Sequence, residues 1–306
     1  MTQPDYRNVG GPLPIVRLSL TFRALDPLQL PDYAGSTWRG AMGQALRRTV
    51  CVCPGAECHD CMLRDACWYA RLYETPVNPD CRLLAGYRDA PTPLVPVMRP
   101  LGGVRAVGDP LRLELTLFGQ GRDAVPFLVR AAQRMAAFGL GRGRGKLVLD
   151  DWQLLDDVDG PGGPWQPPEP WSAVRLRLET PLRLRVANRV LGPGDFTPRP
   201  FVTALLRRLS LLACHHGGGN PELDYTALAE QAREMEVLER DLIWFRWARY
   251  SSRQQRHIDM DGLLGWIELR PTPDLWPLLW AGQWLHVGKG ASMGMGKYRL
   301  EAVAEA

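Results

Sequence analysis

The chain has 306 residues, 45% of them hydrophobic and 23% charged, and a formal net charge of +4. This length is enough for two domains, each with its own hydrophobic core. The small net charge excludes a polycation that binds nucleic acid over its whole surface. The polar N-terminus lacks the pattern of a signal peptide, and no apolar run reaches membrane-spanning length. We therefore expect a cytoplasmic protein that does not associate with a membrane.

The first half of the chain alternates between strand patterns, which have a period of two, and amphipathic helix patterns. Ser36 stands where a hydroxyl group would cap the first helix. A glycine-rich break, "GLGRGRG" at 139–145, separates the second helix from the strand after it. The expected strands are 15–25, 111–119 and 146–155, and the expected helices are 36–50 and 123–138.

A linker is expected at 159–171, where five prolines and three glycines oppose both a helix and a central strand. The same order of patterns then returns, and both halves end with an apolar helix, a glycine-rich loop, a lysine and a strand. This repeat predicts an α+β protein of tandem ferredoxin-like (RRM-like, βαββαβ) domains. We place the first domain at 1–160, with a cysteine-rich insert at 51–67, and the second at 171–306. In the second half, the expected strands are 173–186, 243–252, 262–270 and 297–303, and the expected helices are 200–214 and 274–285.

The three lysines of the chain all lie at the glycine-rich loops, Lys146 after the first and Lys289 and Lys297 in the second. Glycine allows a positive φ and lets backbone N–H groups approach an anion, so glycines beside cations indicate binding of a phosphate backbone. The alternative is a helix-to-strand turn that needs glycine for close packing. Each loop follows a helix and precedes a strand, the reverse of a nucleotide-binding P-loop, which argues against an ATPase.

Five of the seven cysteines lie within the seventeen residues of the insert. Cys58 and Cys61 form a C-x-x-C pair, and Cys51 or Cys53 together with Cys67 can complete a site of four thiolates. A closed set of thiolates indicates a structural zinc ion, with an iron–sulfur cluster as the alternative and His59 as an optional ligand. In a reducing compartment we expect metal ligands or free thiols rather than disulfides.

Residues 249–269 begin with arginines that are interleaved with aromatic, hydroxyl and amide side chains. Arg249, Arg253 and Arg256 lie close to Tyr250 and His257 in the sequence. Arginine forks combined with an aromatic ring suit contacts to phosphates and stacking on bases. The segment therefore predicts an RNA-binding strand, and the alternative is a solvated strand edge.

His215 and His216 precede a run of glycines at the expected C-terminus of a helix. A cationic histidine is favoured there by the helix dipole, so we expect a capping role rather than catalysis. The motifs of hydrolase triads, zinc peptidases and dinucleotide-binding folds do not occur in a supporting context.

Four segments, 36–48, 67–74, 249–269 and 286–300, resemble the CRISPR-associated precursor-crRNA processing endoribonucleases of the RAMP superfamily, the Cas-six family. The last segment, with its glycine loop, is the most specific of them. The resemblance implies metal-independent cleavage of CRISPR repeat RNA, in which a 2′-hydroxyl attacks the adjacent phosphate and leaves a 2′,3′-cyclic phosphate. It implies no cofactor for catalysis, and repeat RNA, crRNA and other CRISPR effector subunits as partners. Within the insert it selects as metal ligands Cys51, Cys58, Cys61 and Cys67.

The resemblance also implies that a histidine in or beside the first helix transfers the proton. Here that helix contains no histidine and has Gln44 near the expected position, and an amide cannot act as a general acid or base. The remaining candidates for catalysis are Tyr33, His257 and an arginine–lysine pair that includes Arg47. The residues expected to hold RNA are Arg39, Arg48, Arg142, Arg144, Lys146, Arg249, Arg253, Gly288, Lys289, Gly290, Ser292, Gly294, Gly296 and Lys297.

Two other functions stay open. One is a RAMP protein with weak or no catalytic activity, which binds crRNA within a CRISPR effector complex. The other is a redox enzyme or metalloenzyme that is built on the cysteine cluster and is unrelated to RNA. This last function would leave both glycine-rich loops unexplained.

Overall fold

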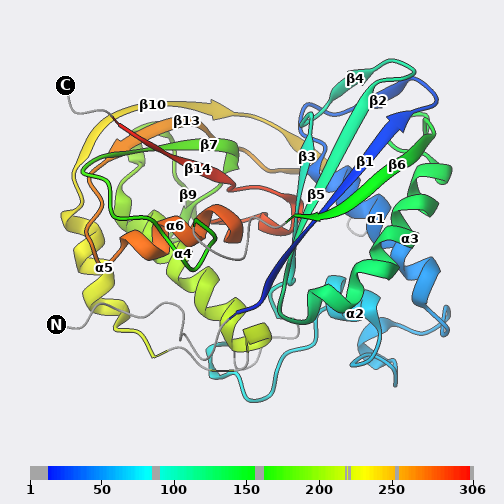
Figure 1. Cartoon of the computed structure of the whole chain (residues 1–306), viewed down its shortest axis with the longest axis horizontal. Helices are drawn as coiled ribbons and strands as arrows, with labels where there is room; N and C mark the ends of the chain where they lie inside the picture. Colours follow the sequence, from blue (N-terminus) through cyan, green and yellow to red (C-terminus); the bar gives the residue numbers. More distant parts are fainter. Residues whose placement is uncertain are drawn as a thin grey trace. The chain divides into compact units, whose positions relative to one another are not determined.

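The computed structural model of the chain describes residues 13–84, 90–155, 162–217, 219, 222–251 and 255–303. The chain folds into two compact units (Figure 1). The N-terminal unit comprises Gly10–Asp156 and Leu211–Asn220, and the C-terminal unit comprises Met1–Val9, Asp157–Ser210 and Pro221–Ala306. Among the described residues, no helix is long and apolar enough to cross a membrane.

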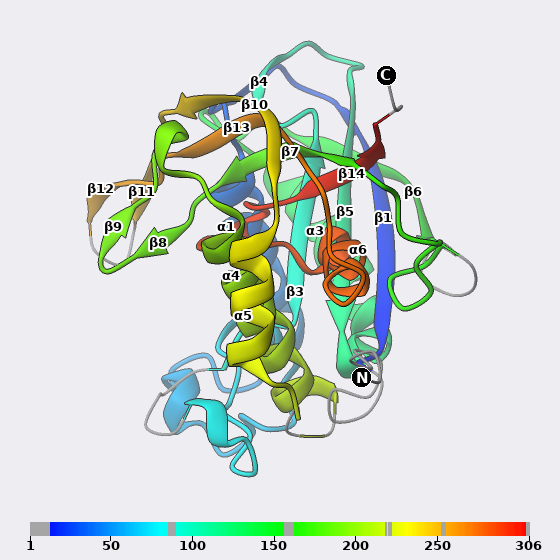
Figure 2. The ribbon, with the colours of Figure 1, turned by 90° about the vertical axis from the view of Figure 1, so that its left-hand side faces the viewer.

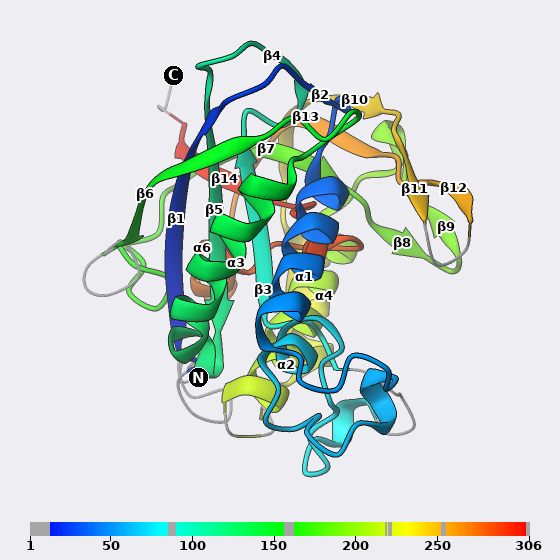
Figure 3. The same cartoon turned by 90° about the vertical axis from the view of Figure 1, so that its right-hand side faces the viewer.

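The N-terminal unit is built on a four-stranded antiparallel sheet with the order β3-β5-β1-β6. Helices α1 and α3 pack together on this sheet (Figure 3). In chain order the elements form a βαββαβ unit, and the sheet order is the ferredoxin-like one. Their bounds are β1 (Ile15–Ala24), α1 (Gly35–Val50), β3 (Leu94–Arg99), β5 (Pro110–Phe118), α3 (Val125–Phe138) and β6 (Leu147–Leu155).

The core of the N-terminal unit follows from the alternation of β1. Leu18, Leu20 and Phe22 are fully buried, and the Phe22 ring lies 5.4 Å from the ring of Trp38 on α1. Burying large apolar side chains of this kind stabilises a fold by about 1.5–3 kcal/mol each. The predicted capping role of Ser36 is wrong: α1 begins at Gly35 with Ala34 at the N-cap position, so Ser36 already lies inside the first turn.

The C-terminal unit repeats the same architecture, with the sheet order β10-β13-β7-β14. Tyr298 of β14 donates a hydrogen bond to the carbonyl of Leu279 on α6 (2.5 Å) and stacks edge-on against Phe201 of α4. The predicted tandem ferredoxin-like fold is therefore confirmed. The elements are β7 (Val174–Leu182), α4 (Pro198–Leu212), β10 (Val237–Phe245), β13 (Gly262–Leu269), α6 (Trp276–Leu285) and β14 (Tyr298–Ala302).

Several short elements are additional to this repeat. The expected strand 243–252 is interrupted at Trp247. The Trp247 side chain is buried, and its backbone N–H donates to the Asp261 carboxylate (3.1 Å) instead of to a neighbouring strand. The segment therefore divides into the end of β10 and the start of a hairpin. The additional elements are β2 (Leu28–Leu30), α2 (Trp68–Tyr73), β4 (Gly103–Arg105), β8 (Arg185–Val186), β9 (Arg189–Val190), a π-helical turn (Ala213–Gly217), α5 (Tyr225–Glu234), β11 (Ala248–Ser251) and β12 (Arg256–Asp259).

The described part of the linker, residues 162–171, consists of turns and irregular backbone. It packs on α6 of the C-terminal unit through tryptophans. The Trp276 indole N–H donates to the carbonyl of Pro168 (2.7 Å), and the Trp276 ring lies 5.3 Å from that of Trp171. This segment is therefore part of the C-terminal unit's surface rather than a free spacer.

The N-terminal unit contains one covalent link that corrects a sequence prediction. Cys81 and Cys214 form a disulfide across 133 residues of sequence, with their Cα atoms 5.5 Å apart. The sequence predicts free thiols or metal ligands in place of disulfides, and this bond shows that the prediction is wrong for these two cysteines. The two cysteines lie outside the insert, where spacing gives no indication that they meet.

Candidate nucleic-acid interface

The second glycine-rich loop joins α6 to β14 and closes on itself. The N–H of Val287 donates to the carbonyl of Gly296 (3.0 Å). The loop also binds the backbone at the C-terminal end of β7, since the N–H of Lys289 donates to the carbonyl of Arg183 (2.8 Å) and that of Gly296 to the carbonyl of Pro181 (2.9 Å). The loop is thus fixed to the end of the central strand.

The glycines of this loop are required by the fold. Gly288, Gly290, Gly294 and Gly296 all have φ between 73° and 85°, a region that side chains disfavour. A Cβ added at Gly296 would lie 1.8 Å from the carbonyl oxygen of Val287, and one at Gly288 would lie 2.5 Å from that of Arg183. The packing alternative therefore accounts for the glycines, which by themselves do not indicate anion binding.

His286, at the start of the loop, has a structural role that the sequence did not reveal. Its side chain is 1% exposed, and its Nδ1–H donates to the carbonyl of Met295 (3.1 Å). Burial and the nearby Lys297 ammonium group hold its pKa well below the ordinary value. The imidazole is therefore neutral and holds the two ends of the loop together.

The titration of His286 predicts a loss of stability in acid. The unfolded chain takes up a proton near pH 6.5, whereas the folded chain does not, so protons favour unfolding below that pH. We expect the free energy of unfolding to fall by up to about 1.4 kcal/mol per pH unit as the pH drops below about 6.5. Urea melts of the wild type and of His286→Gln between pH 7.5 and 5 measure this effect. An equal pH dependence in both proteins would contradict it.

The two lysines of the loop have different surroundings. The Lys289 side chain is exposed. Lys297 is half-buried, and its Nζ lies 3.5 Å from the carbonyl of Gln283 and 4.0 Å from the Glu179 carboxylate. Ser292 is half-buried in the short helical turn Ala291–Met293. Lys289 is therefore the cation of this loop that is presented to solvent.

Two hairpins, β8–β9 and β11–β12, lie side by side at one end of the C-terminal unit (Figures 2 and 3). Arg185 and Arg256 are exposed on them, and Arg249 is half-buried. In β11–β12 the exposed His257 is the cross-strand partner of Tyr250. The predicted contact residue Arg253 lies outside the described residues.

The hairpins and the glycine loop share this end because their bases are bonded to the same turn. Arg183 donates from Nη1 to the carbonyl of Asp261 at the base of β12 (2.6 Å), and its own carbonyl accepts from the N–H of Lys289 (2.8 Å). Basic residues of the two hairpins and of the glycine loop therefore lie at this end. We call it the basic end of the C-terminal unit, and it consists of Arg183, Arg185, Arg249, Arg256, His257 and Lys289.

The first glycine-rich loop belongs to the N-terminal unit. Arg142, Arg144 and Lys146 are all exposed on it. Its backbone is held by packing, since the N–H of Arg142 donates to the carbonyl of Gln29 (2.9 Å) and that of Lys146 to the Asp26 carboxylate (2.9 Å). The loop thus presents three cations from a fixed turn, as the second loop presents Lys289.

The arginines of α1 are used in packing. Arg39 lies over the ring of Tyr73 (5.2 Å) and Arg47 over that of Tyr69 (5.7 Å), and the two rings are stacked on each other. Gly43 between them is required, because a Cβ there would lie 2.7 Å from the Tyr73 ring. These cation–π contacts fasten α2 to α1. Arg48 lies separately over Phe138 of α3 (4.7 Å).

Tyr33, a predicted catalytic residue, lies in the core of the N-terminal unit. It is 1% exposed, and burial raises the pKa of its phenol well above the ordinary value. A phenol in this position cannot touch a phosphodiester, so the geometry argues against a catalytic role. Gln44 is exposed on α1.

The cysteine insert carries the four predicted metal ligands. Its five cysteines are half-buried free thiols. Partial burial raises the pKa of Cys58, against the opposing effect of the Arg47 guanidinium. Among the described residues, no group of three histidines, cysteines or carboxylates is placed to hold a metal ion. The zinc or iron–sulfur site at Cys51, Cys58, Cys61 and Cys67 therefore stays a prediction.

The region that contains the basic end matches a known family. Residues 176–298 match the model of the CRISPR-associated endoribonuclease Cas6 family. This match covers only the C-terminal part of the chain, which is therefore similar to Cas6. Residues 13–164 match a separate family model that is described as an N-terminal domain. No curated protein matches the chain.

Solved structures share the fold of this chain over most of its length. A product complex of Thermus thermophilus Cas6 has a TM-score of 0.58 at 18% identity, over 94% of this chain and 99% of that one. A RAMP protein that binds different RNA substrates has a TM-score of 0.51 at 13% identity, over 94% and 99% of the two chains. A partial Cas6-RT-Cas1–Cas2 complex has a TM-score of 0.55 at 14% identity, over 94% of this chain and 46% of that one.

Proposed function

We propose that this chain binds CRISPR repeat RNA and cleaves it to mature crRNA without a metal ion. In the proposed reaction a 2′-hydroxyl attacks the adjacent phosphate, giving a 2′,3′-cyclic phosphate and a free 5′-hydroxyl. The observation that carries the proposal is the basic end of the C-terminal unit, which lies inside the region that matches Cas6. A redox enzyme built on the cysteines is disfavoured, because it would leave this group of cations without a role.

The basic end has the chemistry that an RNA backbone needs. Exposed cations on a fixed loop and on two hairpins can neutralise successive phosphates of the RNA. The counterions that were condensed on these phosphates are then released, and their release drives binding. Arginine forks also bond phosphate oxygens in pairs. We propose that Arg249 and Lys289 hold phosphates here. We propose the same role for the loop cations Arg142, Arg144 and Lys146 of the N-terminal unit.

Lys289 and Lys297 give a matched test of this binding surface. Lys289→Ala should weaken RNA binding and reduce the slope of log K against log salt by about 0.7 to 0.9, because one phosphate contact is lost. Lys297 is bonded inside the fold, so Lys297→Ala should lower the melting temperature and change the salt slope less. Filter-binding titrations over a range of salt concentrations, with thermal melts, measure both effects. An unchanged slope in Lys289→Ala would remove this loop from the binding surface.

Cleavage also needs a group that moves a proton, and we propose His257 for this role. Of the five histidines, His286 is buried, His59 lies in the insert next to Asp60 (3.0 Å), and His215 and His216 belong to the N-terminal unit. His257 is exposed on β12 of the basic end, where it is paired with Tyr250 of β11. A positioned imidazole can donate a proton to the leaving 5′-oxygen, and nearby guanidinium groups can stabilise charge on the phosphate.

The partners proposed for this chain are repeat RNA, crRNA and other CRISPR subunits. The similar structures support them, because one is a Cas6 product complex and another is a complex that contains Cas1 and Cas2. The structural zinc or iron–sulfur site stays a prediction, and the proposed reaction does not depend on it. Metal analysis of protein purified without chelators tests that prediction.

A non-catalytic RNA-binding protein is the second candidate function. It is favoured by the absence of a histidine from the sequence of α1 and by the burial of Tyr33. Single-turnover incubation of labelled repeat RNA with excess protein tests the two functions, with a shuffled RNA of equal length as the control. The proposed function predicts cleavage of the repeat at one position. Tight binding of the repeat without cleavage would favour the second candidate.

A further inference from the structure

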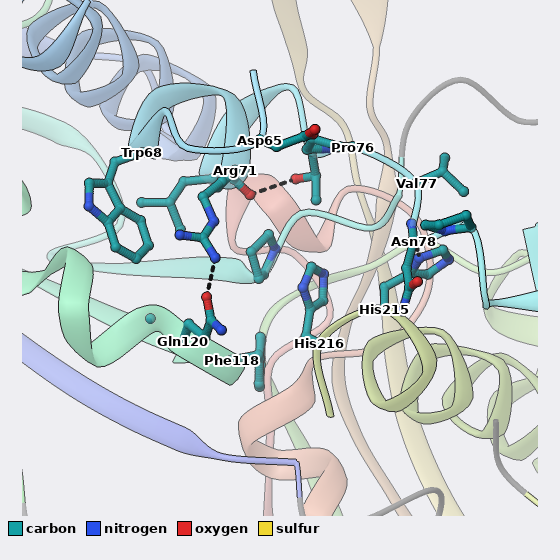
Figure 4. Close-up of a pocket in the computed structure, with 15 residues that line it drawn as sticks. Asp65, Trp68, Arg71, Pro76, Val77, Asn78, Phe118, Gln120, His215 and His216 are labelled. Atoms are coloured by element: carbon teal, nitrogen blue, oxygen red, sulfur yellow. Dashed lines mark hydrogen bonds between the residues drawn. The ribbon is translucent and has the colours of Figure 1, made fainter. Parts of the chain in front are cut away.

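The N-terminal unit contains a pocket that the proposed reaction does not use. Its volume is about 510 Å³, within the range of cavities that bind small molecules. Helix α2, the loop after it, the short helix Gly119–Ala124 and the π-helical turn form its walls (Figure 4). The side chains that matter for the argument are Trp68, Arg71, Gln120, His215 and His216.

The wall that carries His215 is fixed by hydrogen bonds. The N–H of Asn78 donates to Nδ1 of His215 (3.2 Å), and the Asn78 amide donates to the carbonyl of Cys214 (3.2 Å). The disulfide between Cys81 and Cys214 ties the same two segments together. Since Nδ1 accepts, the proton of the neutral ring is on Nε2, and burial lowers the pKa of His215 and so favours this neutral form.

The second histidine is also held in place. His216 donates from Nε2 to the carbonyl of Pro91 (2.8 Å), which fixes the plane of its ring. Gly119 has a φ of 64°, and a Cβ there would lie 2.6 Å from the carbonyl oxygen of His216. The π-helical turn thus presents its histidines on a rigid wall, and single π turns are frequent at functional sites.

The opposite wall carries a cation that is stacked on an aromatic ring. The Arg71 guanidinium lies 4.6 Å from the centre of the Trp68 ring and donates to the side-chain oxygen of Gln120. Figure 4 shows this bond inside the pocket. A guanidinium group has five N–H donors, and this bond uses one of them. Arg71 can therefore donate to an anion from its other N–H groups, and the face of the guanidinium turned away from Trp68 can stack on a base.

We propose that this pocket binds one unpaired nucleotide of an RNA, an inference that rests on the proposed function. Arg71 bonds the phosphate, the base stacks on the flat groups of the walls, and the Gln120 amide bonds a base edge. Splayed single-stranded bases are recognised in this way by aromatic rings and arginine planes. The volume suits one nucleotide, and a double helix is too wide to enter. The Asp65 carboxylate at the rim disfavours a ligand with many phosphates.

Equilibrium dialysis of the full chain with the four nucleoside 5′-monophosphates tests the pocket. We expect one nucleotide to bind per chain, and Arg71→Ala and Gln120→Ala to weaken binding at least tenfold. Arg122 is exposed on the same short helix and does not line the pocket, so Arg122→Ala is the matched control and should bind as the wild type does. Thermal melts of each variant show whether the fold is kept. No saturable binding, or equal binding in all folded variants, would overturn the proposal.

Two further arms separate the alternatives. If inorganic phosphate displaces the bound nucleotide at the same concentration as an unlabelled nucleotide does, the pocket binds only an anion. Recognition of the base is then refuted. If the wild type cleaves repeat RNA but binds no mononucleotide, the pocket proposal fails alone. Nucleotide binding that depends on Arg71, without binding or cleavage of repeat RNA, would instead contradict the proposed function and leave the pocket's ligand class standing.

Discussion

His257→Ala should lower the single-turnover rate of repeat cleavage by about 10²- to 10⁴-fold, the usual effect of removing a positioned acid or base. Binding of the repeat should change by less than about tenfold, because Arg249, Arg256 and Lys289 remain. The loss should therefore appear in the rate at saturating protein rather than in the dissociation constant. Quench-flow or manual time courses with labelled RNA measure both quantities.

His59→Ala is the control for this variant. His59 is also a surface histidine, but it lies in the cysteine insert and is paired with Asp60. The His59→Ala variant should cleave repeat RNA as fast as the wild type. If His257→Ala cleaves at the wild-type rate, another group transfers the proton and the basic end only binds RNA.

Gly296→Ala should destabilise the C-terminal unit by roughly 3–5 kcal/mol, the range of severe core defects. The added Cβ would lie 1.8 Å from the carbonyl oxygen of Val287, and the residue would be held at a φ of 73°. Because Val287 and Gly296 are bonded across the loop, the collision cannot be relieved without opening the loop. Chemical denaturation followed by tryptophan fluorescence measures the change.

Gly143→Ala separates the two causes of this destabilisation. Gly143 has a φ of 86°, but a Cβ there would meet no described atom within 4 Å. It should therefore cost only the strain of a positive φ, about 1–2 kcal/mol. Similar losses in the two variants would show that the carbonyl contact at Gly296 contributes nothing.

The duplicated fold could be predicted because its signals are local. Alternation in β1 and in β7, and the two glycine-rich loops before the last strands, are visible within windows of about ten residues. Two βαββαβ units then leave few arrangements, because crossovers are right-handed and neighbouring elements pack. The prediction of one strand at 243–252 is wrong because the backbone N–H of Trp247 is bonded to the Asp261 carboxylate. This contact joins residues fourteen positions apart and leaves no sign in the local sequence pattern.

The sites were harder to predict, because residue type does not reveal surroundings. The positions of the Arg39 and Arg47 guanidinium groups over tyrosine rings could not be read from the sequence, and their predicted roles at the RNA stay predictions. Tyr33 has suitable chemistry but lies in the core. The pocket depends on a contact between Asn78 and His215, which are 137 residues apart. Only the fold brings such residues together, so spacing could not indicate them.

Incubating the purified protein with labelled repeat RNA in excess EDTA, and mapping both product ends, tests the central claim most directly. The proposed reaction predicts undiminished cleavage at one position, with a 2′,3′-cyclic phosphate on the upstream product and a 5′-hydroxyl on the downstream product. A repeat in which the nucleotide before the cut carries 2′-deoxyribose should bind and stay intact, because the attacking oxygen is missing. Cleavage that stops in EDTA, or that leaves a 3′-hydroxyl and a 5′-phosphate, would contradict the account.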